Sequence, residues 1–168
     1  MCIRDRLLSK TPIEEKRYAQ LDSFLIARGV LFGRTNGVDV ACTHLSAALS
    51  DPVYNGPFDS YAAENAAQIQ TLFTMMTSED ARPQVLVGDF NTGPEVGGLA
   101  GSLPDNYDLF AAEGWSNPNI ELGMPLCTWC AENLIVGGSR NRAIDHIFVR
   151  GTTAVSYTHL TLPTTPYV

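Results

Sequence analysis

The chain has 168 residues, of which 45% are hydrophobic, and it carries a formal net charge of −7. This length and composition suit one domain with an ordinary globular core. The excess of acidic residues repels polyanions and argues against strong, unspecific binding to them. Bound cations can offset this repulsion locally. No apolar run approaches the roughly 18 residues that a transmembrane helix needs, and no secretory signal is visible.

The two ends of the chain differ from the rest. Residues 1–6 have no hydrophobic periodicity, and residues 156–168 are rich in Thr and Pro and carry no charge. Both segments resemble peptides that arise when sequencing-adapter DNA is translated, and a disordered native tail is the alternative. We therefore expect one partial domain over 7–155 with non-native ends. The compartment is unknown on this interpretation, because the true N-terminus would be missing.

The first half of the chain predicts a β-hairpin and a long loop. Residues 13–17 are charged and are expected to be helical or loose. Aromatic and β-branched residues predict a strand over 24–32, and Thr35-Asn36-Gly37 is a strong hairpin-turn signal. Residues 38–43 would be the returning strand. Two prolines, a glycine and an asparagine predict a surface loop over 46–58.

A helix with an apolar stripe is expected next. Asp59 or Ser60 can cap its N-terminus, and the helix would end near Ser78, before the Arg82-Pro83 break. The apolar residues at helical spacing are Ala62, Ala66, Ile69, Phe73 and Met76.

The second half alternates strands with irregular segments. We expect strands over 84–88 and 144–149, and a further strand within 128–135. The remaining segments are a loop at 92–103, a short helix at 107–113 and an irregular stretch at 115–125. Hairpins with a covering helix predict a layered α/β domain with sheets inside and helices outside.

The most informative segment is Val85-Leu86-Val87-Gly88-Asp89-Phe90-Asn91-Thr92. A buried strand ends here, and Asp89 and Asn91 occupy alternate positions, so their side chains point the same way while Phe90 turns into the core. A carboxylate beside a carboxamide can hold a hard cation, orient a water or hydrogen-bond a phosphate oxygen. A strand followed by an ordinary Asx turn is the alternative.

Three segments in this order resemble motifs of the endonuclease/exonuclease/phosphatase superfamily. They are Thr43-His44 at the end of a strand, Gly88-Asp89-Phe90-Asn91, and Ile144-Asp145-His146-Ile147. The superfamily includes deoxyribonuclease I-like nucleases, sphingomyelinases and inositol polyphosphate phosphatases. The resemblance covers roughly residues 28–150.

The resemblance implies a four-layer α/β/β/α sandwich of mixed, largely antiparallel sheets, here incomplete. It also implies a hydrolase, a phosphodiesterase or phosphatase that uses Mg²⁺ or Mn²⁺ to activate water against a phosphate ester. His44 would then act at the scissile phosphate, and Asp89 and Asn91 at the metal and phosphate. Asp145 would orient a catalytic histidine, and Thr128 would lie near the phosphate.

Two departures from the family pattern are clear. No apolar strand ending in glutamate precedes Arg28, and no Ser-Asp-His motif follows Asp145. We therefore expect an internal fragment of an enzyme that is itself poorly active. A non-catalytic relative that serves as a binding module is the alternative. His146 is not expected to supply the missing base, because strand alternation turns it away from Asp145.

Other polar and aromatic residues near these motifs leave alternatives open. Arg140 and Arg142 could meet substrate phosphates or simply be solvated, and Trp129 is expected in the core. Cys127 and Cys130 form a lone C-x-x-C, for which a local disulfide or two thiols is favoured over zinc. The substrate would be a phosphate ester, with nucleic acid, a phospholipid head group and a small molecule undecided. We expect a monomer with no membrane span.

Overall fold

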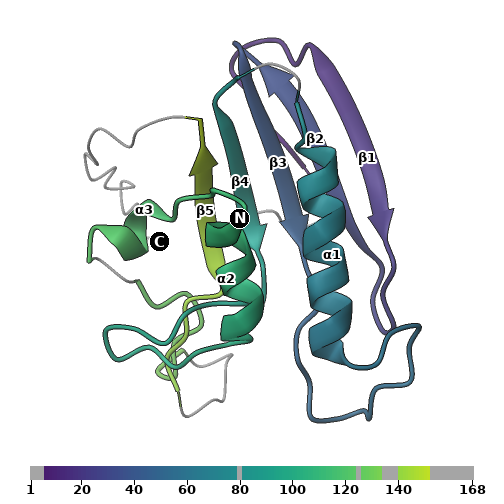
Figure 1. Cartoon of the computed structure of the whole chain (residues 1–168), viewed down its shortest axis with the longest axis vertical. Coiled ribbons are helices and arrows are strands. Elements are labelled where there is room, and N and C mark those ends of the chain that lie inside the picture. The colour runs from purple at the N-terminus through teal and green to yellow at the C-terminus, as the bar shows by residue number, and fades with distance from the viewer. Residues whose placement is uncertain (1–5, 79–80, 124–125, 134–139, 152–168) are drawn as a thin grey trace, which may run out of the picture.

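Five strands form one mixed sheet in the computed structural model, which describes residues 6–78, 81–123, 126–133 and 140–151 (Figure 1). The strands lie side by side in chain order, and β3 and β4 are the parallel pair among antiparallel neighbours. Their bounds are β1 Glu15–Leu21, β2 Arg28–Thr35, β3 Val38–His44, β4 Gln84–Asp89 and β5 Asp145–Arg150. The mixed, largely antiparallel α/β fold that the sequence predicts is confirmed.

A tight turn at Asn36 and Gly37 joins β2 to β3, as predicted. Both residues have positive φ, 49° and 75°, which is the backbone that a two-residue hairpin turn of type I′ requires. The turn fixes the antiparallel register, in which Arg34 lies opposite Asp39 and Val30 opposite Thr43.

Helix α1 (Tyr61–Met75) makes the crossover between the parallel strands β3 and β4. The side-chain oxygen of Ser60 accepts a hydrogen bond of 3.1 Å from the backbone N–H of Ala63, so the predicted cap is confirmed. Ile69 and Leu72 are fully buried on the helix face that meets the sheet. The crossover helix therefore provides one wall of the core.

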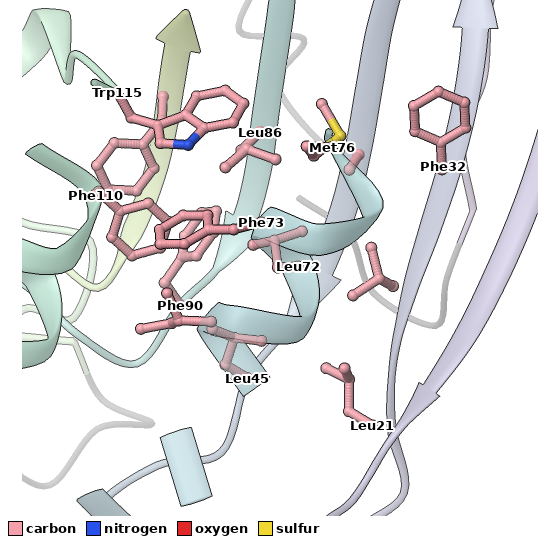
Figure 2. Close-up of a cluster of buried hydrophobic side chains, with 14 residues drawn as sticks. Leu21, Phe32, Leu45, Leu72, Phe73, Met76, Leu86, Phe90, Phe110 and Trp115 are labelled. Carbon is pink, nitrogen blue, oxygen red and sulfur yellow. The ribbon is translucent and has the colours of Figure 1, made fainter. Parts of the chain in front are cut away.

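The core lies between the sheet and the helices that cover one of its faces (Figure 2). Phe110 of α2 (Pro104–Ala112) stacks on Phe148 of β5, with ring centroids 4.1 Å apart. Phe73 of α1 meets the edge of the same Phe110 ring at 5.2 Å. Among the described residues the helices thus pack on one sheet face, which matches the incomplete sandwich that we expected.

Several predicted boundaries were wrong. Residues 13–17 were expected to be helical or loose, but they lead into β1, whose polar sequence becomes a strand by pairing with β2 along its whole length. The strand expected over 24–32 begins at Arg28, after a bend. Local propensity does not reveal such pairing, because a neighbouring strand supplies the hydrogen bonds.

The region after α2 also differs from expectation. The stretch 115–125 was expected to be irregular, but it contains the one-turn helix α3 (Pro118–Glu121). Within 128–133 the structure has an isolated bridge between Trp129 and Arg142 instead of the expected strand. Residues 134–139 lie outside the described part, as do the predicted non-native ends apart from Arg6. No helix of the described part is long and apolar enough to cross a bilayer.

Candidate functional site

Three polar side chains come together at one end of the sheet. In the strand register His44 of β3 lies beside Asp89 of β4, and Asp89 lies beside Asp145 of β5. Their side chains point to the sheet face opposite α1, because the alternate residues of each strand face the core. We call these three residues, His44, Asp89 and Asp145, the carboxylate row. They come from segments far apart in the sequence, and Asp89 lies in the middle.

A glycine before Asp89 permits this close arrangement. Gly88 has a φ of 149°, and a Cβ at this position would collide with the carbonyl oxygen of Thr43 on the neighbouring strand. The glycine therefore lets β4 approach β3 closely just before the neighbouring residues His44 and Asp89.

The carboxylate of Asp89 is held from two sides. Its Oδ2 lies 3.3 Å from Nε2 of His44, and its Oδ1 accepts a hydrogen bond of 2.9 Å from the backbone N–H of Asn91. The Asn91 backbone is left-handed, with φ of 52°, a conformation that asparagine tolerates better than most residues. The Asx turn that the sequence offered as the alternative is therefore present at Asp89 and Asn91.

The side chain of Asn91 is fixed as well. Its Nδ2 donates a hydrogen bond of 2.8 Å to the carbonyl oxygen of Leu45, just beyond β3. The amide oxygen remains as the atom that can bind a cation or accept a hydrogen bond from a ligand. Asp89 and Asn91 thus each retain a hard oxygen donor at this end of the sheet.

The pKa of Asp89 is raised from 3.8 to about 6. Burial is the largest cause, and the negative charge of Asp145 adds to it. The backbone N–H of Asn91 and the positive charge of Arg28 act in the opposite direction. A buried carboxylate with another carboxylate beside it favours a bound cation, which would offset both effects.

Thr128 supports Asp145 through the backbone. Its Oγ1 accepts hydrogen bonds from the backbone N–H groups of Ile144 at 2.9 Å and Asp145 at 3.0 Å. The predicted substrate-binding threonine thus positions the start of β5, and its hydroxyl hydrogen is left to donate to another group. A disulfide between Cys127 and Cys130 brackets this segment, which is one of the alternatives that the sequence left open.

His146 points away from the carboxylate row, as strand alternation predicted. Its side chain is buried, with Nδ1 2.9 Å from Nδ2 of Asn117 and Nε2 2.8 Å from the carbonyl oxygen of Thr92. A neutral ring that accepts at Nδ1 and donates at Nε2 satisfies both contacts. Burial lowers the pKa of His146 to about 4, so this histidine is a structural group of the core.

Arg28 is a site residue that the sequence analysis missed. Its charge interacts with the carboxylates of Asp89 and Glu64, while burial lowers its pKa. A signal was available, because counting in register from the Asn36-Gly37 turn places Arg28 at the same sheet end as His44. No motif marks Arg28 in the sequence, where it only interrupts an apolar stretch.

Trp129 was expected in the core, and this was wrong. The residue is 40% exposed and lines a cavity of about 780 Å³ together with Asp89, Thr128 and Asp145. The C-x-x-C segment places the indole at the protein surface, where hydrophobicity alone would not put it. The candidate site is therefore an open hollow with carboxylates on one side and an aromatic ring on another.

A divalent cation fits the chemistry of this site, although the described residues contain no group of three His, Cys, Asp or Glu side chains arranged to hold a metal. Mg²⁺ commonly uses one or two protein carboxylates and completes its shell with water and substrate phosphate. Asp89 and the amide oxygen of Asn91 are hard donors of the kind that Mg²⁺ and Mn²⁺ prefer.

Comparison with known proteins gives the family. A model of the endonuclease/exonuclease/phosphatase family matches residues 6–167. The chain belongs to this family. No curated protein matches the chain.

Several solved structures share the fold of this chain. TDP2 of D. rerio, in complex with a single-strand DNA product, matches with a TM-score of 0.55 and 14% identity over 80% of this chain and 52% of its own. Sphingomyelinase C of Streptomyces griseocarneus matches with a TM-score of 0.56 and 16% identity. The match covers 86% of this chain and 52% of the sphingomyelinase. A mannosyl-6-phosphatase of Bacteroides thetaiotaomicron matches with a TM-score of 0.51 and 18% identity. The match covers 84% of this chain and 53% of the phosphatase. The chain thus spans about half the length of these structures.

Proposed function

We propose that the whole protein is a Mg²⁺- or Mn²⁺-dependent phosphoesterase and that this chain carries part of its active site. The observation that carries the proposal is the row of His44, Asp89 and Asp145 across the ends of three neighbouring strands. Membership of the endonuclease/exonuclease/phosphatase family supports it. The named activities of the structural relatives, a sphingomyelinase and a mannosyl-6-phosphatase, support phosphate esters as the substrate class.

Each residue receives a role from its chemistry. Asp89 and Asn91 would hold the cation, which when bound neutralises phosphate oxygens and lowers the pKa of water. His44 would donate a hydrogen bond to the scissile phosphate, with its ring oriented by the contact of 3.3 Å to Asp89. Asp145 would orient the general base of the whole protein. Thr128 would direct its hydroxyl hydrogen to the phosphate.

A non-catalytic binding module is the weaker candidate. Burial raises the pKa of Asp89, so this carboxylate costs stability at neutral pH. A chain that only bound a partner would have no need to retain such a group beside Asp145.

Hydrolysis of model esters tests the proposal. We expect the chain to release 4-nitrophenol slowly from bis(4-nitrophenyl) phosphate with Mg²⁺ or Mn²⁺, and not with EDTA. Asp89→Ala should lower this rate about a hundredfold, because it removes a group acting on the cation and phosphate. Asp22→Ala is the matched control, since Asp22 is exposed in a loop outside the carboxylate row. Undiminished hydrolysis by Asp89→Ala would contradict the proposal. A parallel assay with 4-nitrophenyl phosphate, a monoester, distinguishes a phosphodiesterase from a phosphomonoesterase.

A further inference from the structure

A second, smaller cavity adjoins the candidate active site. Its volume is about 160 Å³, several times the roughly 30 Å³ that one water occupies in the liquid. Its lining residues are Ala47, Ala48, Leu49, Asn91, Ser102, Trp129, Arg142 and Ile144. Trp129 also lines the cavity that holds Asp89 and Asp145, so the two cavities share this residue.

We propose that this second cavity binds a second phosphate group of the substrate through the guanidinium of Arg142. The inference rests on the proposed function, because it names the kind of phosphate ester that the site would select. It assigns Arg142 and Trp129 to substrate recognition, beside the residues that act on the scissile phosphate.

Arg142 has the electrostatic properties of an anion-binding residue. Its Nε is buried without a hydrogen-bond partner, and no carboxylate stands among the described residues that line the cavity. A buried donor left unpaired is costly, and the guanidinium fork matches the oxygens of a phosphate in a bidentate arrangement. Arg142 as a whole is half-buried, so it is not the fully solvated arginine that the sequence offered as the alternative.

The backbone ties this cavity firmly to the candidate active site. Trp129 and Arg142 exchange two backbone hydrogen bonds, each 3.0 Å long. Thr128, next to Trp129, accepts from the backbone of Asp145. On the other side, Asn91 lines the small cavity while its backbone N–H holds Asp89. The distance between the two phosphate positions is thus set by the fold.

The same residues narrow the ligand chemistry. The guanidinium at the cavity disfavours a cationic group such as choline, so a phosphocholine head group fits poorly. The half-exposed indole of Trp129 offers a flat surface on which a nucleobase or a sugar ring can stack. A phosphate ester with a neighbouring phosphate fits both features, and it can come from a nucleic acid strand or from a small bisphosphate.

Paired ligands that differ by one phosphate test the inference by isothermal titration calorimetry in EDTA. The nucleotide pair is TpT and its 5′-phosphorylated form pTpT, and the sugar pair is fructose 6-phosphate and fructose 1,6-bisphosphate. We expect the wild-type chain to bind the doubly phosphorylated member of at least one pair about fivefold more tightly. Arg142→Gln should abolish this preference. Arg140→Gln removes the same charge from an exposed neighbour outside the cavity and should retain it.

Two further variants guard against misfolding and separate the two proposals. Arg142→Lys keeps the charge and should keep part of the preference, whereas Trp129→Ala should weaken both members of the nucleotide pair. A preference confined to the sugar pair identifies a small bisphosphate as the source and still supports the site. Equal binding within both pairs, or an unchanged preference in Arg142→Gln, would overturn it. Phosphate preference together with hydrolysis that is undiminished in Asp89→Ala refutes the proposed function alone. Hydrolysis that depends on Asp89 but shows no phosphate preference refutes this inference alone.

Discussion

Asp89 is the residue at which fold stability and the proposed chemistry conflict. Its carboxylate is largely buried, with 26% of the side chain exposed, and Asp145 is its neighbour in the strand register. The raised pKa means that the folded state holds the Asp89 proton more tightly than the unfolded state does. The stability of the fold therefore falls as pH rises from 3.8 through about 6, where the unfolded chain ionises first.

Removing this charge should stabilise the metal-free chain. We expect Asp89→Asn to raise the free energy of unfolding by about 1–2 kcal/mol at pH 7.5 and to have little effect at pH 4, where folded Asp89 is protonated. The asparagine keeps the Oδ1 acceptor for the backbone of Asn91. Urea denaturation at both pH values measures the difference, with the exposed Asp22→Asn as control. A loss of stability at pH 7.5 would show that the charge of Asp89 is well compensated.

Individual site residues differed in how far the sequence could place them. Alternation along β5 turned His146 away from Asp145, as expected. It did not place Asn91, because β4 ends at Asp89 and the left-handed Asn91 backbone is held by its hydrogen bond to the Asp89 side chain. Trp129 and Arg142 could not be paired, because a bridge between irregular segments joins them. No periodic pattern marks such a bridge, so the second cavity was invisible in the sequence.

At the scale of elements, α1 does more than cover the sheet. Asn65, fully buried on this helix, donates hydrogen bonds to the carbonyl oxygens of Ser46 at 2.8 Å and Phe90 at 3.0 Å. Phe90 stands between Asp89 and Asn91. One side chain of α1 therefore binds the backbone just after β3, which ends at His44, and just after β4, which ends at Asp89.

Substitution of Asn65 should weaken both the fold and the site. Asn65→Ala leaves two buried carbonyl oxygens without this donor, and we expect the free energy of unfolding to fall by about 2–3 kcal/mol. Gln70→Ala, at an exposed position of the same helix, should change it by less than about 0.5 kcal/mol. Urea denaturation compares the variants. Equal effects would mean that the buried amide does not anchor the two segments.

Elements with a strong local signal were predicted well. The Asn36-Gly37 turn, the Ser60 cap and the apolar run before Asp89 each have a local physical cause. β1 has none, because its polar sequence gains its strand structure from pairing with β2. The one-turn helix α3 is likewise too short for a periodic pattern to reveal it.

In the whole molecule, the three motifs by which the sequence resembles the family lie on neighbouring strands of one sheet. The chain spans about half the length of the solved structures it matches. Its net charge of −7 also sets a condition. On the proposed function a phosphate ester would have to approach this acidic protein, and a cation at Asp89 together with Arg142 would provide local attraction.

Direct titration with Mn²⁺ shows whether this end of the sheet holds a divalent cation. Isothermal titration calorimetry near pH 7.5 should find a saturable site on the wild-type chain and on Asp22→Asn. Asp89→Asn should bind at least about tenfold more weakly, because it removes the charged donor. Equal Mn²⁺ affinity in the wild-type chain and in Asp89→Asn would contradict the account.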